Sequence, residues 1–167
     1  GVFCGGNNTG NTIDFVTIMT TGNATDFGDL TSAREASRAL SSSTRGVIIG
    51  GSSVDTIEFI TIASQGNSID YGTTSTPGSE AYGNGGYSNS VRGVYAIAYA
   101  QPSNVAVNTV EFFNINVGGA AQDFGDLTFA RQQTSGASEA NGGLNDGYMG
   151  TRPLPFNEAG GDRGIIA

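Results

Sequence analysis

The segment Thr12-Ile13-Asp14-Phe15-Val16-Thr17-Ile18 decides the fold, because the chain contains it three times. The second copy is Thr56-Ile57-Glu58-Phe59-Ile60-Thr61-Ile62, and the third is Thr109-Val110-Glu111-Phe112-Phe113-Asn114-Ile115. Each copy carries apolar residues at alternating positions and on both faces, which is typical of a strand in a sheet packed on two sides. Such self-similarity indicates a tandem-repeat protein.

A second element follows the acid of each copy at a constant distance of twelve residues. This element is an Asp-aromatic-Gly motif, and it reads Asp26-Phe27-Gly28, then Asp70-Tyr71-Gly72, then Asp123-Phe124-Gly125. We expect the aromatic residue to fill the core between repeats, the glycine to permit a tight bend and the aspartate to cap a turn.

A third element, an apolar run introduced by Arg-Gly, opens each new unit. It reads Arg45-Gly46-Val47 and Arg92-Gly93-Val94, and the chain ends on a fresh start, Arg163-Gly164-Ile165. The sequence predicts one domain of three four-stranded repeats, at about residues 1–44, 45–91 and 92–145. Residues 146–167 are expected to start a further unit or to close the array, and the opening in mid-strand suggests a processed product or a fragment of a longer chain.

Charge and histidine content exclude several function classes. All seven cations are arginine, fifteen acids bring the net charge to −8, and there is no histidine. Such a surface repels nucleic acid and anionic membranes, so neither is an expected partner. Without histidine the chain lacks the usual general base and the commonest metal ligand, so the sequence predicts no enzyme, no catalytic or metal site and no cofactor. The single cysteine, Cys4, is expected to be a buried small hydrophobe.

The candidate structural sites are the residues that recur from repeat to repeat. They are Asp14, Phe15, Asp26, Phe27, Glu58, Phe59, Asp70, Tyr71, Glu111, Phe112, Asp123, Phe124, Arg45 and Arg92. We expect the acids at the first repeated position to form ion pairs between repeats with Arg45 and Arg92. As an alternative for the aspartates of the second element, the pairs Asp26/Asp29 and Asp123/Asp126 would supply oxygen ligands to calcium.

Four tyrosines cluster in and after the second repeat, namely Tyr82, Tyr87, Tyr95 and Tyr99. We expect them to lie in the core between repeats, and stacking on a sugar is the alternative.

The repeat resembles the kelch repeat. The resemblance rests on the glycine pair Gly50-Gly51, the strand that follows it, the aromatic at Tyr71 and the arginines Arg34 and Arg131. Phenylalanine or tyrosine stands where kelch units carry tryptophan, and Gly78 replaces the arginine of the second repeat. The resemblance implies an all-β fold built from kelch-like β-propeller blades.

Over nearly its whole length the chain is also similar to kelch-like tandem-repeat proteins of marine bacteriophages of the cyanophage type. The specific run is residues 11–31, Arg45-Gly46-Val47 opens the next unit in the same way, and residues 141–153 resemble a further segment of those arrays. This similarity implies a structural, surface-exposed virion protein, such as a tail fibre, adhesin or capsid decoration that contacts the host. Its location would be the virion or the extracellular space, and its partners other virion proteins and a host-surface glycan. The alternative is a bacterial extracellular repeat protein that binds carbohydrate or forms filaments.

Three blades do not close a propeller, which has about four to eight. The beginning and the end of the chain stand at the same phase of the repeat. We therefore expect the partners of this chain to be other copies of itself, two of which would form a six-bladed ring, or further repeats of a longer chain. A β-solenoid or fibre is the alternative architecture.

Overall fold

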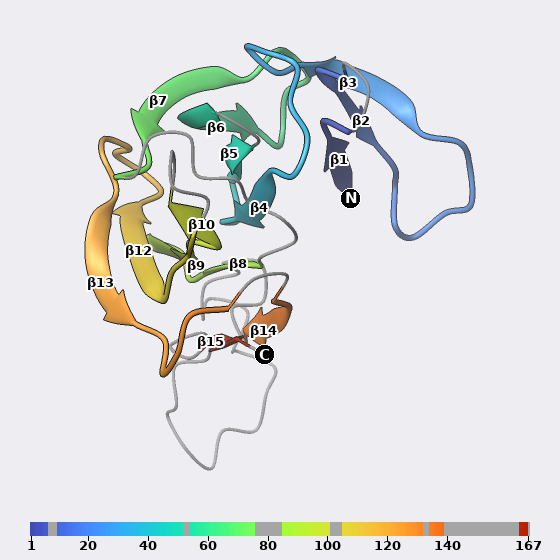
Figure 1. The fold of residues 1–167 in the computed structure, drawn as a ribbon. Coiled ribbons are helices and arrows are strands. Elements are labelled where there is room, and N and C mark those ends of the chain that lie inside the picture. Colours follow the sequence, from blue (N-terminus) through green and yellow to red (C-terminus); the bar gives the residue numbers. More distant parts are fainter. Residues whose placement is uncertain are drawn as a thin grey trace.

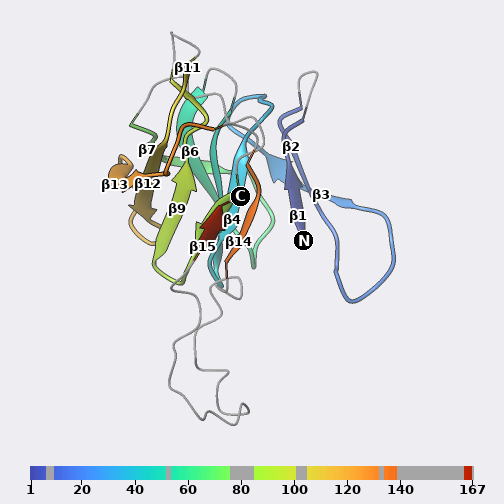
Figure 2. The ribbon, with the colours of Figure 1, turned by 60° about the horizontal axis from the view of Figure 1, so that its bottom comes forward.

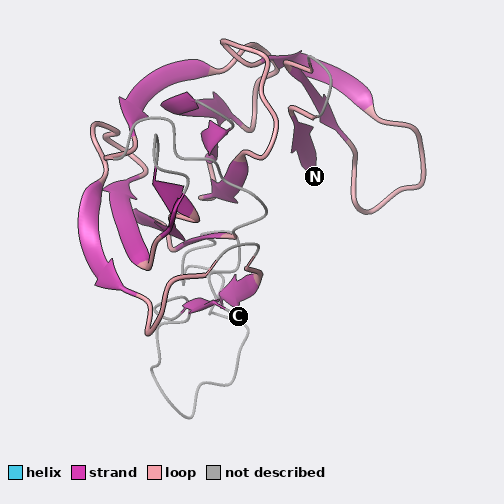
Figure 3. Ribbon diagram, viewed as in Figure 1, coloured by secondary structure: helices cyan, strands magenta, loops and turns pink. Residues whose placement is uncertain are grey.

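The computed structural model describes residues 1–6, 10–51, 54–75, 85–100, 105–131, 134–138 and 164–166. Strands and loops make up all of these ranges, and none of the described residues is helical (Figure 3). The described part of the chain accordingly holds no helix that could span a membrane. The prediction of an all-β protein is confirmed.

The strands form three antiparallel sheets that follow one another along the chain. The first sheet is β1 (Val2–Cys4), β2 (Thr12–Phe15) and β3 (Thr25–Asp29). The second is β4 (Arg38–Ser41), β5 (Arg45–Gly51), β6 (Val54–Thr61) and β7 (Ile69–Thr73). The third is β8 (Gly86–Ser88), β9 (Arg92–Ala96), β12 (Thr109–Asn114) and β13 (Gln122–Asp126).

Two pairs of short antiparallel strands complete the described structure. One is the hairpin of β10 (Tyr99–Ala100) and β11 (Val105–Ala106), and the other pairs β14 (Gly136–Ser138) with β15 (Gly164–Ile166), which is distant in the sequence. The three sheets stand side by side in an open arc, with β3, β7 and β13 along its outer side (Figures 1 and 2). On the inner side β4 lies beside β8, and β8 lies beside β14. The described strands do not close into a ring.

The sheets are offset by one strand from the sequence repeats. The last strand of the first repeat, β4, pairs with β5 of the second, with Leu40 opposite Val47. In the same way β8 pairs with β9 of the third repeat, with Tyr87 opposite Val94. The chain therefore enters each new sheet by its innermost strand, and every repeat boundary falls inside a sheet.

Each sheet carries an irregularity at its acidic residue. The register between the second and third repeated strands shifts next to Asp14, Glu58 and Glu111. Across from each shift, an aspartate carboxylate accepts a hydrogen bond from the glycine two residues later, and these bonds are Gly28 N to Asp26 (3.0 Å), Gly72 N to Asp70 (3.2 Å) and Gly125 N to Asp123 (2.9 Å). The aspartate was predicted to cap a turn, whereas it accepts this bond at an irregularity inside a strand. A β-bulge of this kind re-aims a side chain out of the regular alternation.

Apolar residues fill the two spaces between neighbouring sheets. Between the first and second sheets, Ile13, Phe27, Leu30, Ile48 and Ile60 form one buried cluster. A larger cluster between the second and third sheets includes Ile57, Tyr95 and Phe113. We call these two contacts the first seam and the second seam. Burial of this apolar surface is the main force that holds the sheets together.

The motif aromatics do not all share one environment. Phe27 is 6% exposed and packs edge-on against Phe15, whereas Phe124 is 53% exposed and packs only against Phe112 among the described rings. The prediction that the aromatic fills the core between repeats therefore holds for Phe27, and it is wrong for Phe124. The difference arises because β13, which carries Phe124, has no sheet on its outward side among the described residues.

Candidate functional site

The buried charges of the molecule lie in the seams, and Glu58 is the centre of the first one. Glu58 is fully buried on β6, yet most of its partners come from the first repeat. Thr31 donates to its carboxylate through both the backbone N–H, at 3.1 Å, and the hydroxyl. The Ser68 hydroxyl and the Arg34 guanidinium supply the remaining bonds. A buried carboxylate is stable only when its oxygens are satisfied in this way.

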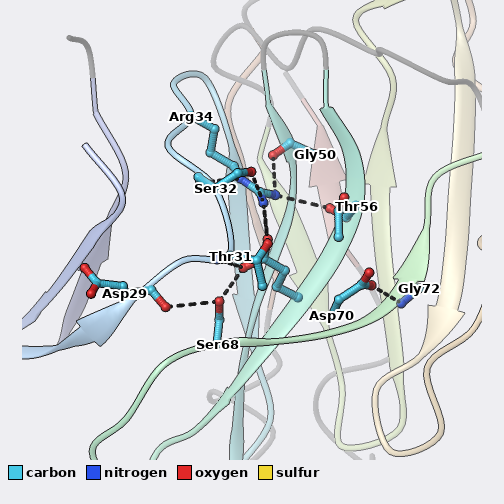
Figure 4. Close-up of polar contacts among 10 residues, drawn as sticks. Asp29, Thr31, Ser32, Arg34, Gly50, Thr56, Ser68, Asp70 and Gly72 are labelled. Carbon is cyan, nitrogen blue, oxygen red and sulfur yellow. Dashed lines mark hydrogen bonds and ion pairs between the residues drawn. The ribbon is translucent and has the colours of Figure 1, made fainter. Parts of the chain in front are cut away.

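Arg34 is the cation of this seam, and its position depends on the loop between β3 and β4. It forms a fully buried ion pair with Glu58, and its Nη2 also donates to the Ser32 hydroxyl at 3.0 Å and the Thr31 hydroxyl at 3.3 Å (Figure 4). Its Nη1 lies 3.4 Å from the carbonyl oxygen of Gly50. The planar guanidinium can donate hydrogen bonds to several oxygens at once, in a geometry that a lysine ammonium does not offer.

The glycine pair at the end of β5 makes room for this arginine. Gly51 has a φ of 143°, a value that side chains rarely adopt, and a Cβ placed there would lie 3.2 Å from Arg34 Cβ and 2.9 Å from the Glu35 carbonyl oxygen. A larger residue would push the arginine loop away from the sheet. The doublet that marks the repeat in sequence is thus a site of close approach in the structure.

Glu111 is the fully buried acid of the second seam, and it is satisfied differently. Ser75 donates from its hydroxyl and from its backbone N–H, the latter at 3.4 Å, and Tyr95 donates its hydroxyl. Tyr95 lies on β9 directly opposite Glu111. Burial, reinforced by the charge of Glu111, raises the pKa of Tyr95 well above its ordinary value, which keeps the phenol protonated as a donor.

The cation nearest to this arrangement is Arg38 on β4. Its guanidinium carbon lies 5.2 Å from the centre of the Tyr95 ring, and none of its three side-chain nitrogens has a hydrogen-bond partner among the described residues. Burial lowers the pKa of Arg38 to about 10, while the charges of Tyr95 and Glu111 act in the opposite direction. Arg38 therefore acts through the face of the tyrosine ring and through space rather than by a direct bond.

The predicted pairing of the acids with Arg45 and Arg92 is wrong. Arg45 stands opposite Thr61 in the sheet, three positions beyond Glu58, so its side chain reaches the end of the strands. There it stacks on Phe59 at 4.4 Å and donates to the carbonyl oxygens of Ile115, at 2.8 Å, and Asn116, at 2.9 Å. Arg92 stacks in the same manner on Phe112, at 4.8 Å.

Sequence reasoning assigned Arg34 to the repeat pattern but missed its partner. A usable signal was present, because Arg34 and Arg131 each stand twenty residues after the acid of their own repeat. That constant spacing marks a repeated role as clearly as the spacing of the aromatics does. The pairing crosses to the acid of the next repeat, and nothing in the spacing states this.

Asp14, the acid of the first repeat, has no counterpart of these bonds. Its side chain is half-buried on β2, and within the described ranges no donor hydrogen-bonds its carboxylate. Of the three acids at this position, only Glu58 and Glu111 are therefore held by a neighbouring sheet.

The remaining candidates divide between core and surface. Tyr87 and Tyr95 are buried, at 6% and 0% exposure, so the stacking of these two rings on a sugar is excluded, whereas Tyr82 lies outside the described residues. The half-buried Cys4 packs against the first cluster, and burial raises the pKa of its thiol. Among the described residues, no three acidic or thiol side chains gather in a group that could hold a metal ion.

The buried carboxylates are suited to hold sheets together rather than to react. The Glu58 carboxylate accepts hydrogen bonds from Thr31, Ser68 and Arg34, so its lone pairs are already engaged. A general base needs a free lone pair within reach of a substrate proton. No protein-family model and no curated protein matches the chain.

Proposed function

We propose that the chain is a structural, surface-exposed protein of a bacteriophage particle, which serves as a tail fibre, adhesin or capsid decoration. The observation that carries the proposal is the use of the fully buried acids Glu58 and Glu111 as joints between sheets. Buried charge of this kind fixes how one unit sits on the next, which is the requirement of a scaffold. The viral context is supported by the similarity of residues 11–31 and 141–153 to phage repeat proteins.

The three sheets are, in this proposal, blades of a kelch-like β-propeller. Each four-stranded sheet runs in chain order from its inner to its outer strand, and the sheets stand in an arc (Figure 1). Insertions fall between the repeated strands, as the β10–β11 hairpin of the third sheet does. Loops that vary over a fixed scaffold are where a surface protein places its recognition of a host.

Mass spectrometry of purified phage particles tests the viral role. We expect peptides of this chain in the particles at a constant ratio to the major capsid protein, after washing with high salt. Antibodies against the chain should also label the particle surface in electron micrographs. Production of the chain during infection without incorporation into particles would contradict the proposal.

A glycan array tests the adhesin form of the proposal separately. We expect the chain to bind host-surface glycans through its loops, with the sheets unchanged. A chain that is present in particles but binds no host surface or glycan would retain the structural role and lose the adhesin role.

A further inference from the structure

Two backbone hydrogen bonds join each sheet to the next, and they recur at the same repeat positions. In both seams the donors lie in the loop after the acid-bearing strand, and the acceptors lie on the outer strand of the preceding sheet. The four bonds are Gly66 N to Phe27 O (2.8 Å), Ser68 N to Asp29 O (2.9 Å), Gly119 N to Tyr71 O (2.7 Å) and Ala121 N to Thr73 O (2.8 Å). Each seam therefore contains the same pair of backbone hydrogen bonds, and the residues that would form them can be identified in any two repeats.

The outer end of the third sheet carries the acceptor half of this set without a donor. The corresponding positions are Phe124 and Asp126 on β13, and neither makes an inter-sheet backbone bond within the described chain. The Phe124 side chain is 53% exposed, whereas Phe27 at the same position is 6% exposed. The third sheet thus ends in a surface that is built like a seam.

The residues that hold Glu58 in the first seam are also repeated at this end. Arg131 Nη2 donates to the Thr128 hydroxyl at 3.3 Å, which is the distance from Arg34 Nη2 to the Thr31 hydroxyl. Arg131 stacks on Phe129 at 4.0 Å, and within the described ranges its buried Nε has no hydrogen-bond partner. The Thr-Arg pair is therefore assembled, and no described carboxylate lies on it.

The opposite end of the molecule presents the complementary half. Asp14 occupies the position of Glu58, and no described donor reaches it. Phe3, which stands opposite Asp14 in the first sheet, is 61% exposed. The residues opposite Glu58 and Glu111, Ile48 and Tyr95, are 2% and 0% exposed.

The strand edges match as well. β1 is an edge strand of a three-stranded sheet, whereas β5 at the same position pairs with β4. β14 pairs with β15 in the register of β4 with β5, because Ser138 faces Gly164 as Ser41 faces Gly46. The sequence of β15, Gly164-Ile165-Ile166, corresponds to the opening Gly1-Val2-Phe3. β14 therefore already binds a strand of the β1 type.

We propose that the β13–β14 end of this chain binds the β1–β2 face of a second copy. In this seam Thr128 and Arg131 bind the Asp14 carboxylate of the second copy. Phe124 O and Asp126 O accept hydrogen bonds from Gly22 N and Ala24 N of the second copy, which are the repeat positions of Gly66 and Ser68. β1 of the second copy takes the place of β15 beside β14.

Arg92 adds one more contact of the same kind. Arg45 at this repeat position crosses the second seam to the carbonyl oxygens of Ile115 and Asn116. The equivalent positions in the first repeat are Ile18 and Met19, which are 80% and 90% exposed. Arg92 donates to these two carbonyls of the second copy, and the contact covers an apolar loop. Such a head-to-tail contact closes into a ring or continues as a chain of subunits.

Two charge-reversed variants and their mixture test the seam. Asp14→Arg damages the β1–β2 face and leaves the Arg131 end intact, and Arg131→Glu does the reverse. Sedimentation velocity should show the unchanged chain associated into species of at least twice its 17.0 kDa mass. Each variant alone should sediment as a monomer, with association weakened at least tenfold. The mixture should associate again, because it restores the native pairing at one seam and creates the reversed pair at the other.

The mixture also separates a failed seam from a failed fold, since a misfolded variant is not rescued by its partner. Gln65→Lys adds a positive charge on an exposed loop outside the proposed seam, so it controls for a general effect of net charge and should leave association unchanged. A chain that stays at 17.0 kDa at every concentration would overturn the proposal. So would association that Asp14→Arg and Arg131→Glu leave intact, or variants that remain monomeric when mixed.

Discussion

The first and second seams satisfy a buried carboxylate with different hydrogen-bond donors. Both bury an acid completely, at the same repeat position and beside the same bulge. In the first seam the acid meets a cation directly, because Arg34 forms an ion pair with Glu58. In the second seam Gly78 stands at the position of that arginine, and a phenol bonds to Glu111 from the acid's own sheet.

The difference shows which property of the seam is repeated. Ile48 and Tyr95 occupy the same repeat position, directly opposite the acid on the neighbouring strand. The tyrosine, with its hydroxyl, stands in the second seam, where the arginine is missing. Among the described residues, four hydrogen bonds satisfy the Glu58 carboxylate and three satisfy that of Glu111, so donors surround the acid in both seams although a charged donor is present in one. A buried carboxylate loses several kcal/mol when its hydrogen bonds are unmade, roughly 1–3 kcal/mol for each group left unsatisfied.

Neutralising Glu58 should give the largest effect, and comparison with the neutralised Glu111 should separate the two seams. Glu58→Gln leaves a buried guanidinium without its charged partner, so we expect it to lower the free energy of unfolding by about 3–5 kcal/mol. Glu111→Gln leaves no directly bonded cation unpaired, so it should lower the free energy of unfolding by about 1–2 kcal/mol. Urea unfolding followed by circular dichroism measures both values. Equal losses in the two variants would contradict the assignment of Arg34 as the deciding partner.

Removing the phenol donor of the second seam is the next largest change. Tyr95→Phe takes one hydrogen bond from a buried carboxylate and should cost about 1.5–3 kcal/mol. Tyr87→Phe is the matched control, because the buried hydroxyl of Tyr87 has no hydrogen-bond partner in the described part of the chain. We expect that variant to be as stable as the unchanged chain or slightly more stable. A larger loss of stability for Tyr87→Phe than for Tyr95→Phe would contradict the role of Tyr95 as a donor to the buried acid.

Alkaline pH should act on the second core cluster through Tyr71. Burial raises the pKa of Tyr71 from its ordinary 10 to about 12, although Arg45 acts in the opposite direction. The folded chain then keeps a proton that the unfolded chain loses, so this contribution is constant below pH 10 and is lost as the pH rises toward 12. Between pH 8 and pH 11 the unchanged chain should lose about 1 kcal/mol more than Tyr71→Phe does. Parallel pH profiles of the two proteins would show that this phenol does not titrate as described.

Substitution of Arg45 and Arg92 should give the smallest difference in stability. Arg45 lies at a seam that a neighbouring sheet covers, whereas Arg92 lies at one that no described sheet covers. Arg45→Lys gives up stacking on Phe59 and the two carbonyl contacts in the third sheet, so we expect a loss of about 1 kcal/mol. Arg92→Lys loses only its stacking on Phe112, and the loss should be about 0.3 kcal/mol for an isolated chain. Thermal unfolding at low protein concentration measures both, and the order of the two losses is the deciding result.

The sequence predicted the strands well because their pattern is local. Alternation in the acid-bearing segments and the twelve-residue spacing place β2, β6 and β12 opposite β3, β7 and β13, as the structure has them. The pairing of β4 with β5 was not apparent from the sequence. The order in which strands join a sheet depends on long-range contacts, and these leave no mark on periodicity.

The charged site was harder to predict, because it combines residues from different repeats. Arg34 and Glu58 are 24 residues apart, the first in the loop between β3 and β4 and the second on β6. Arg45 is nearer to Glu58 in sequence, but the register sends it to the aromatic rings at the end of the strands. The exposure of Phe124 depends on what lies beyond β13, which no property of its own motif reveals.

The offset between sheets and repeats has a consequence for how such a gene can change in length. Loss of residues 46–92 would join Arg45 to Gly93, and β4 would then pair with β9 instead of β5. Arg34 and Thr31 would stand beside Glu111, an acid at the position of their present partner. Recombination between copies can therefore shorten or extend the array by whole units, and each new joint inherits a complete set of donors and acceptors.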